Sequence, residues 1–158
     1  MDRILSLSAF GDVIPRSKSL KGSIKTTEEG DKYGHLFKMV LQNSSQAKLL
    51  HWQCYLKGQH ETLDEFFKEF LELGDKLAEA VMGKYGKPVL GKDNLILNLQ
   101  NYENPQEGDL SKFAAHLVKC YSEDCKSHFD ADKDPELINI IDEILGLVEQ
   151  NRYLFSLK

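Results

Sequence analysis

Apolar residues recur at the three- and four-residue spacing of an α-helix over four long stretches of this 158-residue chain. The pattern predicts helices over about residues 34–54, 59–85, 109–121 and 135–155. Each helix would have one apolar face, and the four faces can be buried only against one another. The length suits a single domain with a sizeable core, so the sequence predicts an all-α fold.

The breaks between these stretches indicate how the helices connect. Lys57-Gly58 separates the first two helices, and Gly86-Lys87-Pro88 ends the second. Asp134 as N-cap and Pro135 at the first helical position start the fourth. Residues 89–108 form a long connection in which LILNLQNY, residues 95–102, is a candidate short helix. Four helices with one long connection between the second and third predict a four-helix bundle with a crossover, the ferritin-like arrangement.

Residues 1–33 differ in composition from the rest, being rich in Ser, Lys and Gly without a helical period. We therefore predict an extended N-terminal arm over 1–33 and a bundle over 34–158. Residues 1–25 hold five basic and two acidic side chains, and five minus two leaves a charge of +3. This arm is a candidate for binding DNA phosphates, or else for pairing as a strand or packing between subunits. The candidate DNA contacts are Arg16, Lys18, Lys21 and Lys25.

The apolar runs, the net charge and the cysteine content exclude several classes of protein. No apolar run approaches the roughly 18 residues that a membrane span needs, and the N-terminus lacks the features of a secretion signal. We therefore expect a cytoplasmic protein without a membrane partner. The net charge of −5 argues against a nucleic-acid binder that uses its whole surface. Cys54, Cys120 and Cys125 are odd in number and form no C-x-x-C pair, which favours buried thiols over disulfides or zinc ligands.

The second helix carries two pairs of candidate metal ligands. His60 and Asp64 are four residues apart, as are Asp75 and Glu79, so both pairs lie on one face. His60 and Asp75 are separated by about 22 Å along the helix, too far to share one metal. An antiparallel second copy, related by a two-fold axis near residues 69–70, would bring His60 and Asp64 beside Asp75 and Glu79 of the partner subunit.

The chemistry of this set is that of a moderately hard metal site. Imidazole with carboxylates suits Fe(II), Mn(II) or Zn(II). No histidine has an acid three residues before it, so the sequence argues against the Glu-x-x-His di-iron centre inside a bundle. The same helix is rich in other acids, so by spacing alone an ordinary solvated face remains the alternative.

Two segments resemble the core of the Dps-type mini-ferritins, the DNA-binding proteins from starved cells. They are LLHWQCYLKGQHETLDEFF and ELGDKLAEAV, within a resemblance that covers about residues 35–158. The family carries His-Trp at the end of its first helix, then a His, two Asp residues and a further acid at fixed spacing on its second. The matching positions here are His51-Trp52, His60, Asp64, Asp75 and Glu79.

The resemblance implies both an assembly and an activity. It implies two-fold dimers built into a hollow dodecameric shell, with Fe(II) bound and oxidised between subunits, typically by hydrogen peroxide. The protein would store iron and protect against peroxide damage. The implied metal-binding and catalytic residues are His51, His60, Asp64, Asp75 and Glu79. Trp52 would lie near the iron, as a quencher of stray oxidising equivalents or simply as core packing.

One departure from the family keeps two other interpretations open. His60 follows His51 by nine residues, three fewer than is usual in the family, so the turn between the helices is redrawn. The chain could therefore be a divergent, non-catalytic ferritin-like structural or assembly protein with a decayed metal site. It could also be a shell that coats DNA.

Two further groups of residues are candidates either for an ordinary structural role or for a functional one. Asp130, Asp132 and Asp134 form either a solvated loop with an N-cap or, in a shell with three-fold axes, a negative pore that steers cations inward. His35, His116 and His128 have no partner at metal-ligand spacing, and we interpret them as surface or hydrogen-bonded core residues.

Overall fold

Each predicted helical stretch forms a helix in the computed structural model, which describes residues 28–87, 90 and 95–157. The helices are α1 (Glu28–Gln53), α2 (Lys57–Tyr85), α3 (Glu107–Lys119) and α4 (Pro135–Phe155). A π-helical segment, η2 (Cys120–Cys125), and a 3-10 turn, η3 (Lys126–His128), extend α3. The described residues contain no strand, and the all-α class is confirmed. None of the described helices is long and apolar enough to cross a bilayer.

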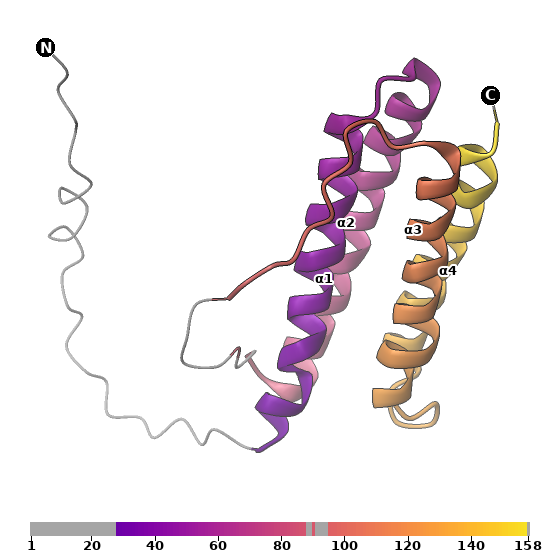
Figure 1. Cartoon of the computed structure of the whole chain (residues 1–158). Helices are drawn as coiled ribbons and strands as arrows, with labels where there is room; N and C mark the ends of the chain where they lie inside the picture. The colour runs from indigo at the N-terminus through magenta and orange to yellow at the C-terminus, as the bar shows by residue number, and fades with distance from the viewer. Residues whose placement is uncertain (1–27, 88–89, 91–94, 158) are drawn as a thin grey trace, which may run out of the picture.

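The four helices lie side by side with roughly parallel axes (Figure 1). α1 and α4 run in one direction, and α2 and α3 run in the other (Figure 1). We call the end with the α1–α2 turn the upper end, and the end where α1 begins and α2 stops the lower end. Phe66, Phe70 and Tyr121 fill the middle of the core with edge and stacked ring contacts. Cys54, Cys120 and Cys125 are all buried and free, as predicted.

The segment 95–106 lies extended along α1, so the short helix predicted at 95–102 is wrong. The backbone amide of Asn98 donates to the side chain of Gln42 at 2.8 Å, and that of Gln100 donates to Gln46 at 2.6 Å. Four residues of helix rise about 6 Å and two residues of extended chain about 6.6 Å, so the two ladders stay in register. Glutamine side chains satisfy the backbone amides that a helix would have satisfied internally.

The bundle begins earlier than the composition of the N-terminal region indicated. α1 starts at Glu28, six residues before the predicted start of the first helix at residue 34. Tyr33 is buried and stacks on Tyr85 at 4.5 Å and on Phe129 at 5.7 Å between ring centres. This aromatic stack anchors the first turns of α1 in a stretch with no apolar period of its own.

Asp134 closes the lower end with a buried carboxylate. It stands at the N-cap of α4, as predicted, but its side chain does not bond the amides of that helix. Instead it accepts hydrogen bonds from Tyr85 Oη at 2.5 Å and from the Asp130 amide at 3.0 Å, beside Lys84 Nζ at 2.7 Å. Burial opposes ionisation, but the bonds from Lys84, Tyr85 and the Asp130 amide outweigh it and lower the pKa of Asp134 to about 2.

Candidate metal centre

A turn of only three residues, 54–56, joins α1 to α2 at the upper end. The Cys54 amide continues the α1 ladder to Leu50 at 3.0 Å, and the His60 amide bonds the Leu56 carbonyl at 2.8 Å. Lys57 and Gly58, predicted as the break, already belong to α2. The tight turn brings the rings of His51 and His60 to 4.0 Å between centres. The shortened spacing therefore joins these two histidines rather than separating them.

His51 is held in the orientation that metal-binding histidines use. Its side chain is mostly buried, and its Nδ1 lies 3.1 Å from the His60 carbonyl oxygen. A carbonyl can only accept, so Nδ1 carries a proton, and in the neutral imidazole the lone pair is then on Nε2. That Nε2 faces Asp64 Oδ1 at 3.7 Å. A backbone carbonyl that fixes the tautomer in this way is a recurring second contact of histidines that bind metals.

Asp64 is ionised but not free. Its Oδ2 accepts a hydrogen bond from Lys68 Nζ at 2.5 Å, and Lys48 Nζ lies 3.8 Å from Oδ1. The bond from Lys68 is the largest of the effects that lower the pKa of Asp64. The carboxylate is half-buried, so water screens these ion pairs in part. A cation that binds Asp64 must therefore displace Lys68 or share the carboxylate with it.

Of the five predicted ligands, His51 contacts His60 and faces Asp64 in one chain, whereas the other two lie elsewhere. Asp75 and Glu79 are exposed on α2, and Asp75 is about 16 Å beyond Asp64 along the helix axis. Within the described residues, no group of three or more His, Cys, Asp or Glu side chains is arranged to hold a metal ion. One chain therefore presents His51, His60 and Asp64 as a partial site.

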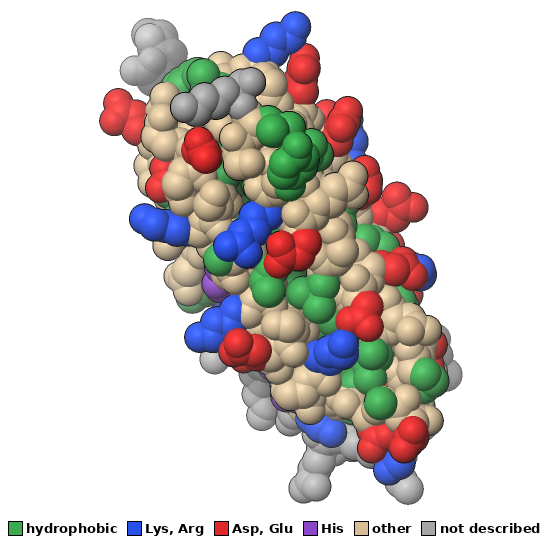
Figure 2. All heavy atoms as spheres, turned by 90° about the vertical axis from the view of Figure 1, so that its right-hand side faces the viewer, with side chains coloured by type: hydrophobic (Ala, Val, Ile, Leu, Met, Phe, Trp, Pro, Cys, Tyr) green, Lys and Arg blue, Asp and Glu red, His purple; other side chains and the backbone are tan. Residues whose placement is uncertain are grey.

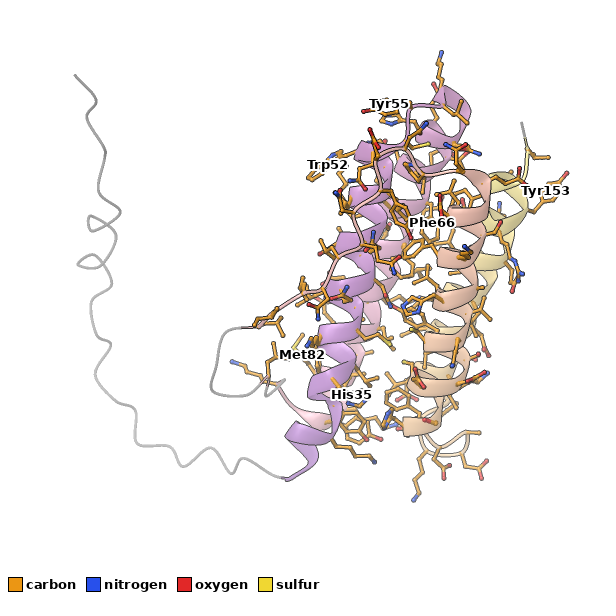
Figure 3. All side chains as sticks on the ribbon, viewed as in Figure 1. His35, Trp52, Tyr55, Phe66, Met82 and Tyr153 are labelled. Atoms are coloured by element: carbon orange, nitrogen blue, oxygen red, sulfur yellow. The ribbon has the colours of Figure 1, made fainter. Side chains whose placement is uncertain are left out.

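Trp52 projects outward from the end of α1 (Figure 3) and is 67% exposed, so it is not core packing. It borders a cleft of about 330 Å³ between α1, α2 and the connection, which we call the Trp52 cleft. Lys48 lies over the rings of Trp52 and Phe67, at 5.8 and 4.7 Å, while its ammonium also approaches Asp64. The cleft and the partial metal site are therefore adjacent. The apolar side chains of the cleft are Leu41, Leu49, Trp52, Phe67, Leu71 and Leu99.

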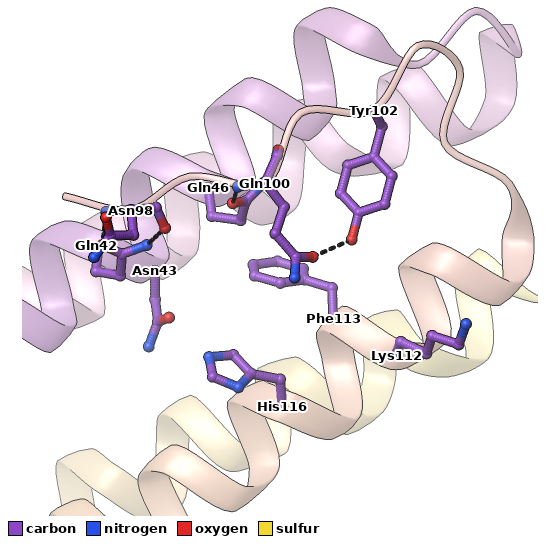
Figure 4. Close-up of a pocket in the computed structure, with 9 residues that line it drawn as sticks. All are labelled: Gln42, Asn43, Gln46, Asn98, Gln100, Tyr102, Lys112, Phe113 and His116. Carbon is purple, nitrogen blue, oxygen red and sulfur yellow. Dashed lines mark hydrogen bonds between the residues drawn. The ribbon is translucent and has the colours of Figure 1, made fainter.

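A second cavity, of about 380 Å³, lies between α1, the connection and α3 (Figure 4). Side-chain amides dominate its wall, and the buried Asn43 Nδ2 has no hydrogen-bond partner among the described residues. His116 lines the cavity, and its Nε2 lies 3.4 Å from Cys120 Sγ. Burial raises the pKa of Cys120, so this thiol stays protonated and is a poor nucleophile. The residues in the wall include Gln42, Asn43, Gln46, Gln100, Tyr102 and His116.

The other predicted site residues lie at the lower end of the bundle or outside the described residues. Asp134 is buried against Lys84, and Asp130 Oδ1 accepts the amides of Asp132 and Lys133 at 2.9 and 3.2 Å. A cation pore would therefore rest mainly on the exposed Asp130 and Asp132, and it stays a prediction. His35 and His128 are in direct contact, although 93 residues separate them and no local spacing indicates the pair. The proposed DNA contacts Arg16, Lys18, Lys21 and Lys25 lie outside the described residues.

Comparison with known proteins gives one match. The model of a family described as being of unknown function (DUF5856) matches residues 51–155. The matched region begins at His51 and includes His60, Asp64, Asp75 and Glu79. No curated protein matches the chain, and neither does any solved structure.

Proposed function

Because the chain belongs to DUF5856, a family of unknown function, we propose its function from its own residues: a Dps-like ferroxidase and iron-storage protein. It would bind Fe(II) as substrate between two-fold-related subunits, oxidise it, and protect a cytoplasm against peroxide. The observation that carries the proposal is the meeting of His51, His60 and Asp64, with His51 Nε2 left free to bind a cation.

The path of the chain supports a ferritin-like topology. α2 and α3 run in the same direction, so the connection between them must return along the bundle (Figure 1). Residues 98–102 make that return beside α1, with their amides on glutamines of that helix. A bundle with one long crossover between its second and third helices is the arrangement of the ferritin-like folds.

The Trp52 cleft supports a second copy of the chain as the missing half of the site. Phe67 and Leu71 lie on either side of positions 69–70, where the two-fold axis would pass. Leu71 is 42% exposed, and an antiparallel α2 from the partner would cover it. The same docking would bring Asp75 and Glu79 of one chain to the partial site of the other, beside Lys48 and Lys68. Opposite charges would therefore face each other around an apolar centre.

The residues suit the oxidation of iron. Neutral imidazoles of His51 and His60 tether Fe(II), and the carboxylates stabilise Fe(III) relative to Fe(II). Each Fe(II) loses one electron, and a hydrogen peroxide molecule takes up two electrons and two protons to leave as two waters. A few weak ligands leave coordination positions open, as turnover requires.

Fe(II) oxidation by the purified full chain tests this proposal. The rate with hydrogen peroxide should exceed that in buffer, and His60→Ala or Asp64→Asn should lower it at least tenfold. Glu65→Gln, an exposed acid on the same helix, is the matched control and should leave the rate unchanged. Rates equal to buffer in the wild-type protein would refute the ferroxidase. Sizing by light scattering tests the shell, which a stable monomer would contradict.

A non-catalytic assembly protein is the second candidate, favoured by the two lysines on Asp64. If Lys68 stays bonded to the Asp64 carboxylate, the partial site serves as a structural contact of a shell.

Binding of DNA would then depend on the N-terminal arm, because acidic and basic side chains are interspersed on the face that Figure 2 shows. A gel shift with and without residues 1–25 measures the part played by the arm. No iron oxidation above buffer in the wild-type protein, together with a particle larger than a monomer, would favour the non-catalytic candidate.

A further inference from the structure

His35 and His128 meet at the lower end of the bundle, far from the partial site at the upper end. His35 lies near the start of α1 (Figure 3), and His128 is the last residue of η3. Their Nε2 atoms are 2.8 Å apart, and their ring centres are 4.4 Å apart. His35 is exposed and His128 half-buried, so a solute can reach the two nitrogens from solvent.

The two distances together indicate that both nitrogens face one point. Two imidazole nitrogens bound to one cation at about 2.05 Å and at the 90° angle of octahedral or square-planar coordination lie about 2.9 Å apart, with ring centres about 4.5 Å apart. At the tetrahedral angle usual for Zn²⁺ the nitrogens lie about 3.3 Å apart, so binding of Zn²⁺ in that geometry would open the pair slightly. A straight N–H···N hydrogen bond of about 2.9 Å would place the centres about 5 Å apart. The observed 2.8 and 4.4 Å follow the first geometry. The rings are tilted by 58° to each other, which ligands in neighbouring coordination positions allow.

We propose that His35 and His128 form a binding site for a divalent transition metal that prefers imidazole, of the class of Zn²⁺, Ni²⁺ and Cu²⁺. The protein supplies two ligands, and water completes the coordination sphere. The bound ion would tie the start of α1 to η3 and so clip together two parts of the chain that are remote in sequence. Metals that prefer oxygen ligands, such as Mg²⁺ and Ca²⁺, would be rejected.

The surroundings of His128 favour its neutral form. Burial first, then His35 and the Lys32 ammonium, lower the pKa of His128, whereas the Asp124 carboxylate raises it. A neutral imidazole is the form that binds metal. Lys32 Nζ lies 5.2 Å from the ring centre of Tyr33, so the lysine ammonium also interacts with an aromatic ring.

Calorimetric titration of the full chain with Zn²⁺, after removal of bound metal, tests the site. We expect His35→Gln and His128→Gln each to weaken one Zn²⁺-binding event at least tenfold, and the double variant to be no weaker than either single one. His116→Gln is the matched control from α3, and it should leave that event unchanged. His51→Gln reports on the upper site, so loss at one end is distinguished from loss at the other.

Histidine resonances of the wild-type protein give a measurement that needs no variant. Sub-stoichiometric Zn²⁺ should shift the ring signals of His35 and His128 together, leave those of His116 in place, and raise the melting temperature by a few degrees. Mg²⁺ at the same concentration should do neither. The proposal is overturned if Zn²⁺ moves neither signal, or if removing one histidine of the pair leaves binding at the wild-type level.

Discussion

The two ends of the bundle carry similar side chains in opposite environments. At the lower end the Asp134 carboxylate is 3% exposed and is satisfied by Lys84, Tyr85 and a backbone amide. At the upper end the Asp64 carboxylate is half-buried and lies beside His51 and Lys68. Both acids have a lowered pKa, but only Asp134 is enclosed by protein. Burial therefore separates a carboxylate whose contacts hold the fold together from one whose ion pairs remain open to solvent.

The difference is one of energy as well as of access. A buried charge that loses its partner leaves an uncompensated group, so each contact at the lower end is costly to remove. An exposed ion pair contributes little, because water and salt replace the partner. The upper end is therefore the part of the bundle that can change ligands without unfolding. This is the property that a turnover site requires.

Removal of the Asp134 carboxylate should have the largest effect on stability. Asp134→Ala leaves the hydroxyl of Tyr85 and the ammonium of Lys84 without their shared partner, so we expect a loss of about 3 kcal/mol in the free energy of unfolding. Urea unfolding measures it. Asp132→Ala, an exposed acid in the same turn, is the control and should change stability by less than about 0.5 kcal/mol. Equal losses in both variants would contradict the contrast between buried and exposed acids.

Acid should destabilise the protein through Asp134 in a defined window. Its pKa is about 2 in the folded state and about 4 in the unfolded state, so its contribution is complete above pH 4 and is lost as pH falls toward 2. We expect about 2 kcal/mol to disappear across this window. Urea unfolding from pH 5 to pH 2 measures it, with Asp134→Asn as control. A variant that loses as much stability as the wild-type protein would show that another group is responsible.

The sequence predicted the elements whose signals are local. Periodicity located the four helices, and Asp134-Pro135 placed the start of α4 at the observed residue. The i,i+4 pair His60 and Asp64, with the resemblance adding His51, indicated the residues that meet at the upper end. These signals lie within one helix or across one short turn. They need no knowledge of how distant segments pack.

The features that were missed depend on distant partners. Residues 95–102 are apolar enough to suggest a helix, but their amides bond glutamines about 50 residues earlier. The early start of α1 depends on the stacking of Tyr33 on Tyr85 and Phe129. His35 and His128 showed no metal spacing because the fold, and not the helix period, brings them together. The acids expected to complete the upper site need a second chain, which one sequence does not place.

Replacing Asp64 should affect stability much less than replacing Asp134. Asp64→Ala removes contacts with Lys68, Lys48 and His51, all partly open to water, so we expect only a small fraction of the loss caused by Asp134→Ala. Urea unfolding in low and high salt measures it, and the difference between variant and wild type should shrink as salt increases. A loss as large as that of Asp134→Ala would mean that the upper end also holds the fold together.

The smallest expected effect isolates the hold of Lys68 on the upper carboxylate. Lys68→Gln removes the ammonium whose hydrogen bond is the main reason for the lowered pKa of Asp64. The pKa of Asp64 should therefore rise toward its ordinary value, while the free energy of unfolding changes by less than about 0.5 kcal/mol. Carboxyl chemical shifts followed against pH measure the first quantity, and urea unfolding measures the second. Lys76→Gln, which breaks an exposed pair with Glu143, is the control that should leave Asp64 unaffected. If Lys68 is the competitor that a cation must displace, Lys68→Gln should also bind Fe(II) more tightly than the wild-type protein. Weaker binding would mean that the lysine assists the site instead of blocking it.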